Sequence, residues 1–386
     1  MRASARLLCL DGARACVLTV LAALASPAGV AFGAEPAPAK RCGACHGPIR
    51  RQWEGSSMSR SWINPVFQAF LSDAKAALGD SIQAKCIACH APLASVTGDT
   101  KVESTVAQEG VTCNFCHNVS DVEASPRPAS YTFDPTDPGL MRGPYSDSDP
   151  GQAHTFTFSP VHTRSDFCAS CHYFSHPQAG VPIETTYERW KSSDYAAKGD
   201  QCQNCHMPPS AGQAAPKVSK MNREKVWAHT FLGAHGPGIL DSVATMQGGV
   251  EADSLKLTIT NRRAGHAIPG GGGGMRMVAL DVTFYDAAGA AMKSVPVQTF
   301  GIFYADEKGN SPVPKWRAKT LARIDEIPSG GARVERCAVP PGAKRAEATL
   351  TYHFVNPAYA ADLSRRQVDL TRHQPVVMAR AMVTLP

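Results

Sequence analysis

The sequence has 386 residues, of which 43% are apolar and 19% are charged, and this composition argues against a disordered protein. Glycine (32) and proline (29) are frequent, which argues against an all-helical bundle. The formal net charge is +6, but no run of Lys and Arg is dense enough to follow a phosphate backbone, so no nucleic-acid partner is expected.

The first 34 residues have the pattern of a secretory signal peptide. Three arginines precede the apolar stretch 15–25, and small residues follow up to Ala34. The stretch is too short to span a bilayer, and no other segment approaches a spanning length. We therefore expect cleavage between Ala31 and Glu35, a mature chain without a transmembrane segment, and a periplasmic, cell-surface or extracellular location.

Five copies of the pattern C-x-x-C-H follow, and this spacing is that of c-type haem attachment. Two thiols at this separation reach the two vinyl groups of one porphyrin, and the adjacent imidazole becomes the proximal iron ligand. A redox pair, a zinc ribbon or disulfides would not require the histidine after each second cysteine. The sequence therefore predicts five covalently attached c-type haems, held by Cys42, Cys45 and His46; Cys86, Cys89 and His90; Cys113, Cys116 and His117; Cys168, Cys171 and His172; and Cys202, Cys205 and His206.

Between these motifs the sequence predicts two helices and a long loop. One helix runs from Pro65 to Leu78, with Asn64 as its cap and Gly79 as its end. The second runs over 186–198 and starts at a capping box formed by Thr185 and Glu188. The segment 124–160 is rich in Pro, Asp, Ser and Gly and is expected to be a loop.

After residue 250 the pattern changes to short alternating or β-branched stretches separated by turns. Strands are expected over 255–260, 278–285, 295–304, 332–339, 347–354 and 376–383. We predict a signal peptide at 1–34, a pentahaem domain at 35–245 and an immunoglobulin-like β-sandwich at 250–386. The fold class is mixed, with a mostly irregular and short-helical haem domain before the sandwich. Cys9 and Cys16 would leave with the signal peptide, so Cys337, on a predicted strand, is the one cysteine of the expected mature chain outside the motifs.

A second repeat has the form W-x-x-S-x-Z, in which Z is Met58 in the first copy and Tyr195 in the second. The tryptophans and serines of this repeat can simply pack and cap. A thioether at Z is a known haem ligand that raises the reduction potential, whereas a methionine can equally fill a gap in a core.

With these motifs assembled, the chain resembles the periplasmic multihaem c-type cytochromes of the cytochrome c-554-like group. The resemblance is carried by the segments 52–56, 64–67, 109–117, 159–162, 186–190 and 202–208, and the segment 261–270 resembles the β-domain that follows the haem region in some of these proteins. It implies electron carriage with two axial ligands per iron. Position Z is often a distal histidine in the family, so Met58 and Tyr195 depart from the family pattern.

Distal ligands are not fixed by counting, because the histidines outside the motifs outnumber the haems. The candidates are His154, His162, His229, His235, His266 and Met58. The two histidines of H-T-F-L-G-A-H stand beside glycines that permit close approach to a macrocycle. His266 belongs to the β-domain and would have to reach a haem across the domain boundary. His353 and His373 are expected at the surface of the sandwich.

Three functions fit these observations. The first is electron transfer between other redox proteins, namely cytochromes, a quinol-linked membrane complex or a terminal reductase. The second is reduction of a small nitrogen or sulfur oxyanion at one haem with an open position. The third is a docking role for the β-domain, and a homo-oligomer is compatible with each of them.

Overall fold

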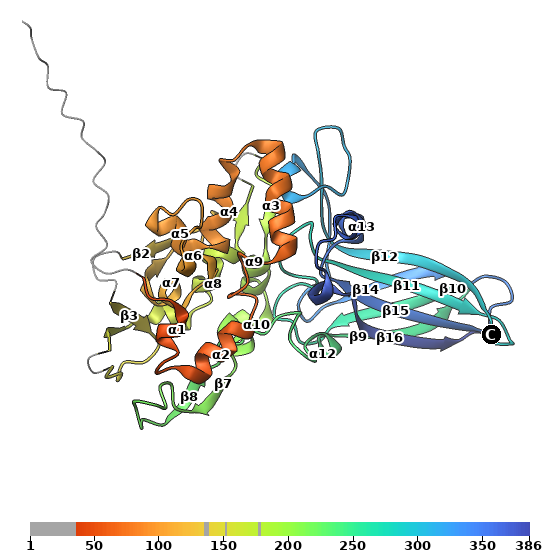
Figure 1. The fold of residues 1–386 in the computed structure, drawn as a ribbon. Helices are drawn as coiled ribbons and strands as arrows, with labels where there is room; N and C mark the ends of the chain where they lie inside the picture. The colour runs from red at the N-terminus through yellow and green to blue at the C-terminus, as the bar shows by residue number, and fades with distance from the viewer. Residues whose placement is uncertain (1–35, 135–138, 151–152, 177–178) are drawn as a thin grey trace, which may run out of the picture.

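A computed structural model describes residues 36–134, 139–150, 153–176 and 179–386 (Figure 1). The expected signal peptide lies outside these residues. An N-terminal region of short helices and small sheets packs against one end of an elongated β-domain. Among the described residues, none of the helices is long and apolar enough to cross a membrane.

The N-terminal region consists of short elements that carry the motifs. Its helices are α1 (Ala39–Cys42), α2 (Gly47–Gly55), α3 (Pro65–Leu78), α4 (Ile82–His90), α5 (Pro92–Thr97), α6 (Thr105–Gln108), α7 (Cys113–Asn118), the 3₁₀-helix η1 (Pro160–Thr163), α8 (Asp166–His172), α9 (Thr186–Lys191), α10 (Asp194–Ala197) and α11 (Cys202–His206). Four two-stranded sheets lie between and after the helices of this region. Three are antiparallel, β1 (Val119–Val122) with β2 (Tyr131–Phe133), β5 (Phe174–Ser175) with β6 (Pro182–Glu184), and β7 (Pro209–Gly212) with β8 (Arg223–Trp227), and one is parallel, β3 (Leu140–Gly143) with β4 (Thr155–Phe158).

Helix α3 has the predicted bounds and the predicted cap. The side chain of Asn64 accepts hydrogen bonds from the backbone N–H groups of Val66 and Phe67, and Gly79 ends the helix with a φ of 84°. Its apolar face packs against Val355 and Leu363 of the β-domain. This helix therefore joins the two parts of the molecule.

The prediction of one helix over 186–198 is wrong. The structure has α9 and α10 instead, and the side chain of Thr185 forms no capping hydrogen bond. The hydroxyl of Ser193 donates to the carbonyl of Trp190 and accepts from the N–H of Ala196, so this serine ends one turn and caps a new helix.

The prediction of a loop over 124–160 is wrong in part. Strand β2 pairs with β1, and β3 pairs with β4 in parallel, within the described part of this segment. Alternating Thr and aromatic residues in both β2 and β4 favour an extended backbone despite the surrounding turn-forming residues.

The β-domain contains two antiparallel sheets. One has the strand order β14-β10-β9 and the other β13-β12-β11-β15-β16. Their bounds are β9 (Ala244–Glu251), β10 (Ser254–Asn261), β11 (Met277–Tyr285), β12 (Ala291–Ala305), β13 (Thr320–Asp325), β14 (Ala332–Ala338), β15 (Arg345–His353) and β16 (Val376–Thr384), and the helical elements are α12 (Leu240–Val243), η2 (Lys315–Arg317), α13 (Pro357–Arg365) and η3 (Thr371–His373). All six predicted strands are present. Sequence analysis missed β9 and β13, and because β9 pairs with β10, the sheet begins before residue 250.

One apolar core lies between the two sheets. Leu255, Leu257 and Ile259 of β10 are fully buried together with Leu280 and Phe284 of β11. Every second residue of β10 is buried, as expected for a strand with one face on a core. The β-domain therefore has its own core, whereas the apolar clusters of the N-terminal region are small.

A glycine-rich loop of the β-domain contacts strand β6 closely. The N–H of Gly273 donates to the carbonyl of Ile183, and the hydroxyl of Tyr304 donates to the carbonyl of Pro182. A Cβ atom on Gly273 would lie 2.0 Å from the Tyr304 hydroxyl oxygen and 2.8 Å from the Ile183 carbonyl. Glycine is required here because only a bare backbone can approach this closely.

We predict that Cys337 stays a free thiol in the mature protein. It lies on β14 opposite Leu255, and burial raises the pKa of its thiol, so alkylation should be slow in the native protein and fast after denaturation. Thiol titration of the denatured, haem-loaded chain should find one thiol per molecule. A titre of zero, with a dimer that disappears on reduction, would contradict this.

Candidate functional site: one cavity shared by five C-x-x-C-H motifs

Short helices position the five motifs. The second, third, fourth and fifth motifs lie within or at the ends of α4, α7, α8 and α11, and the first follows from α1 into the turn before α2. A helical turn brings two cysteines three residues apart to the same side of the helix. None of the eleven described cysteines forms a disulfide, and no group of three or more His, Cys, Asp or Glu in the described residues is arranged to hold a metal ion.

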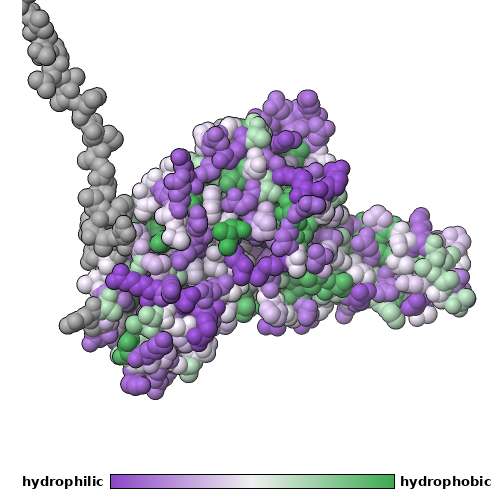
Figure 2. Space-filling model, viewed as in Figure 1, coloured by the Kyte–Doolittle hydropathy of each residue, from purple (hydrophilic) through white to green (hydrophobic). Residues whose placement is uncertain are grey.

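All five motif histidines line one continuous cavity of about 2410 Å³. A site for a single small molecule usually has about 300–1,000 Å³, so this cavity is large enough for several ligands. Figure 2 shows hydrophobic side chains, in green, in the middle of a mostly hydrophilic surface. A large apolar space bordered by cysteines and histidines fits a group of haem macrocycles.

Four of the five motif histidines contact a backbone carbonyl through the same ring nitrogen, Nδ1. The Nδ1 atoms of His46, His90 and His117 are 2.9, 3.0 and 2.5 Å from backbone carbonyl oxygens, and Nδ1 of His206 contacts the carbonyl of Leu232. A proton on Nδ1 leaves Nε2 free to bind a metal, and such a second hydrogen bond orients metal-ligating histidines. The residues present therefore fit proximal haem ligands.

Three motif histidines face a second histidine ring across the cavity. The ring centres are 6.4 Å apart for His46 and His154, 6.3 Å for His117 and His229, and 6.4 Å for His206 and His266. With metal–nitrogen bonds of about 2 Å, two imidazoles on opposite sides of one metal ion have their centres about 6 Å apart.

The three facing histidines have the same hydrogen-bond pattern as the four motif histidines above. Each Nδ1 lies 2.9–3.0 Å from a nearby backbone carbonyl, which leaves Nε2 free. Burial lowers the pKa of His229 to about 4 and also lowers that of His266. Neutral imidazoles at neutral pH are the form that binds iron.

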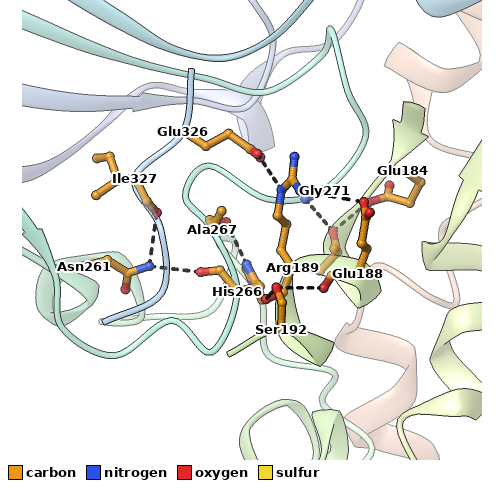
Figure 3. A network of polar contacts seen from close by, with 11 residues as sticks. Glu184, Glu188, Arg189, Ser192, Asn261, His266, Ala267, Gly271, Glu326 and Ile327 are labelled. Carbon is orange, nitrogen blue, oxygen red and sulfur yellow. Dashed lines mark hydrogen bonds and ion pairs between the residues drawn. The ribbon is translucent and has the colours of Figure 1, made fainter. Parts of the chain in front are cut away.

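His266 comes from the β-domain, as the sequence suggested. The side-chain amide of Asn261 donates to the backbone carbonyl of His266, and Nδ1 of His266 lies 2.9 Å from the carbonyl of Ala267 (Figure 3). The neighbouring Gly265 lies against the Tyr195 ring, where a Cβ atom would be 3.4 Å from it.

The other candidate ligands have different surroundings. The ring of His162 also lies near a motif histidine, with its centre 5.7 Å from that of His117, but its Nε2 lies 2.9 Å from the carbonyl oxygen of Cys116 and its Nδ1 is buried without a hydrogen-bond partner in the described residues. His235 stacks on Phe354 at 4.1 Å rather than facing a motif histidine. Met58 lines the cavity, and its backbone carbonyl accepts a hydrogen bond from Val111.

The expectation that His373 lies at the surface of the sandwich is wrong. It lines the cavity 5.4 Å from the ring of His235, with Nε2 3.4 Å from the Asn64 amide nitrogen. The segment around η3 folds back from the sheets toward helix α3, a tertiary contact that strand patterns do not indicate. In the described part of the chain, His90 and His172 have no ring contact with another histidine.

The W-x-x-S-x-Z repeat is also present in the structure. The hydroxyls of Ser56 and Ser193 each donate to the carbonyl of the tryptophan three residues earlier, at 2.6 and 2.7 Å. Both indole N–H groups donate to backbone carbonyls, from Trp53 to Val111 and from Trp190 to Asp200. The tryptophans and serines thus have structural roles, as one interpretation of the sequence held.

Comparison with known proteins agrees with this geometry. Residues 41–118 match the family model described as cytochrome c554 and c-prime. The crystal structure of a penta-haem cytochrome c552 from Thermochromatium tepidum aligns with a TM-score of 0.71 and 22% sequence identity, covering 91% of this chain and 100% of that one. A superoxide reductase in the oxidised state aligns over 37% of this chain and 87% of its own at 12% identity, and its TM-score of 0.18 is too low to indicate a shared fold. No curated protein matches the chain significantly.

The family match contains the first three motifs, and the structural match extends over nearly the whole chain. Both agree with the resemblance that the sequence motifs indicated. Residues 41–118 are therefore similar to the cytochrome c554 and c-prime family, the fold of nearly the whole chain is similar to that of a penta-haem cytochrome c552, and a β-rich region follows the part that carries the motifs.

Proposed function

We propose that this protein transfers electrons between periplasmic redox proteins through five covalently bound haems. The observation that carries the proposal is the single cavity onto which all five motif histidines open. When bound, each haem supplies one-electron iron chemistry, and the chain sets its potential through axial ligands and burial. Other cytochromes, a quinol-linked membrane complex or a terminal reductase would be the partners.

The ring separations support axial pairs at three of the five motifs. We assign His154, His229 and His266 as the distal ligands opposite His46, His117 and His206. Met58, His162 and His235 remain candidates for the other two haems. The β-domain, for which we propose an immunoglobulin-like sandwich, would then be needed for complete coordination of the fifth haem.

One observation favours a second function, reduction of a small nitrogen or sulfur oxyanion. His90 and His172 face no second histidine in the described residues, and His90 stacks instead on Phe67 at 3.9 Å. An exogenous ligand could therefore bind at either haem that Met58, His162 or His235 does not reach. An open position is what separates a haem reductase from a pure electron carrier.

Mass measurement under denaturing conditions tests the haem count. Protein matured with an intact c-type assembly pathway should carry five haem additions, and fewer than five would refute the proposal. Carbon monoxide titration of the reduced protein then distinguishes the two functions: no uptake supports the carrier, and stoichiometric uptake supports the reductase.

Met58 provides a separate prediction about the haem potentials. If its thioether binds iron, Met58→His should lower one reduction potential without changing the haem count, because imidazole favours the oxidised iron more than a thioether does. The sulfur-to-iron charge-transfer band of the oxidised protein should be present in the wild type and absent in the variant. A wild type without this band would mean that Met58 only packs.

A further inference from the structure

His172 of the fourth motif differs from the other four proximal histidines. Among the described residues its Nδ1 contacts no backbone carbonyl and lies instead 4.0 Å from the carboxylate oxygen Oε2 of Glu184. A carboxylate beside a metal-ligating histidine raises the basicity of that ligand, which a neutral carbonyl does less strongly. The fourth motif therefore has its own electrostatic environment.

The Glu184 carboxylate is buried and held in place. Glu184 is 6% exposed, and its Oε1 accepts a hydrogen bond of 2.6 Å from the hydroxyl of Thr186. The same hydroxyl oxygen accepts a hydrogen bond of 3.1 Å from the N–H of Gly271 in the β-domain. Figure 3 shows Glu184 and Gly271 close together at this boundary.

Further contacts from the β-domain fix the backbone on the N-terminal side of Glu184. Gly273 and Tyr304 bind the carbonyls of Ile183 and Pro182, the two residues before it. On the other side, Arg189 of α9 donates to Glu326 of the β-domain at 2.9 Å. The β-domain thus determines where the carboxylate stands relative to His172.

The charge of this carboxylate is not balanced by a paired cation. In the described residues Glu184 forms no ion pair with a lysine or an arginine, and its one such contact is the one with His172. Lys315 lies in the same region without forming an ion pair, since its Nζ and Glu184 Oε2 would lie 4.0 and 3.9 Å from a Cβ atom on Gly272. The negative charge is therefore available to act on His172.

We propose that Glu184 is a positioning residue for His172 and lowers the reduction potential of the haem at the fourth motif. This inference rests on the proposed function. Reduction adds one electron to the iron and removes one positive charge, so a nearby buried anion stabilises the oxidised form. The β-domain would then control this haem by holding Glu184, and not only by supplying His266.

Potentiometric titration of the full-length holoprotein tests this. Glu184→Gln removes the charge and nearly keeps the shape, and it should shift the reduction equilibrium of one haem at least tenfold toward the reduced form, which is about 59 mV for one electron. Glu188→Gln is the control, because this neighbouring glutamate is half-exposed and, among the charged side chains that the structure describes, contacts only Arg189. It should leave all the potentials unchanged. Unchanged potentials in Glu184→Gln, with all haems attached, would overturn the inference.

A second variant keeps the test decisive if Glu184→Gln loses haem. Thr186→Val removes the hydroxyl that holds Oε1 but leaves the charge, and it should raise the same potential by a smaller amount. Unchanged potentials in Thr186→Val would then overturn the inference. A wild-type mass that lacks the haem on Cys168 and Cys171 would instead refute the proposed function, so the two failures are distinguishable.

Discussion

Replacing His266 by alanine should convert the fifth haem from low-spin to high-spin without releasing it. The haem should stay attached because Cys202 and Cys205 are untouched, but the iron should lose the imidazole of His266, whose ring centre lies 6.4 Å from that of His206. Electron paramagnetic resonance of the oxidised protein should therefore show a new high-spin signal equivalent to one haem. Added imidazole should restore the low-spin state.

His353→Ala is the matched control, since His353 is also a histidine of the β-domain and lies on β15 opposite Met277. Its spectra should equal those of the wild type. A His266→Ala protein with an unchanged low-spin spectrum would refute the assignment of His266 as a distal ligand.

Replacing Phe284 by alanine should strongly destabilise the β-domain. Phe284 is fully buried between the two sheets, and a Phe→Ala change in such a core costs about 3–5 kcal/mol through lost burial and the cavity that remains. Urea unfolding followed by far-ultraviolet circular dichroism should show this loss as an earlier transition. Because the β-domain supplies His266, the low-spin signal of the fifth haem should disappear in the same transition.

Thr283→Ala tests the neighbouring position on the other face of β11. The Thr283 hydroxyl pairs with Ser294 at 2.9 Å in an exposed contact, so its loss should change the stability by less than about 0.5 kcal/mol. Equal effects of the two substitutions would contradict the assignment of the core.

The positions of the motifs and several local elements were predictable from the sequence. The motif spacing depends only on adjacent residues, and the cap and end of α3 are set by Asn64 and Gly79. The six predicted strands follow from their alternating patterns, as in β10, where buried and partly exposed residues alternate. These sequence signals depend on neighbouring residues, so they can be recognised without knowing the tertiary structure.

The break between α9 and α10 shows where local reasoning failed. Thr185 and Glu188 match a capping pattern, yet Ser193 competes for the backbone groups in the middle of the expected helix. Strand β13 was missed because five of its six residues are exposed and give no alternating pattern.

The pairing of histidines was decided by the tertiary structure. His154 directly precedes β4 and His229 follows β8, and neither strand was predicted, so the sequence could name both residues as candidates but could not say which motif each one faces. His266 and Glu184 reach their positions through contacts between the two parts of the chain. The sequence by itself determined where the five C-x-x-C-H motifs lie, because each motif consists of neighbouring residues, whereas the tertiary structure decided the surroundings of each motif histidine, because those surroundings are built from segments far apart in the chain.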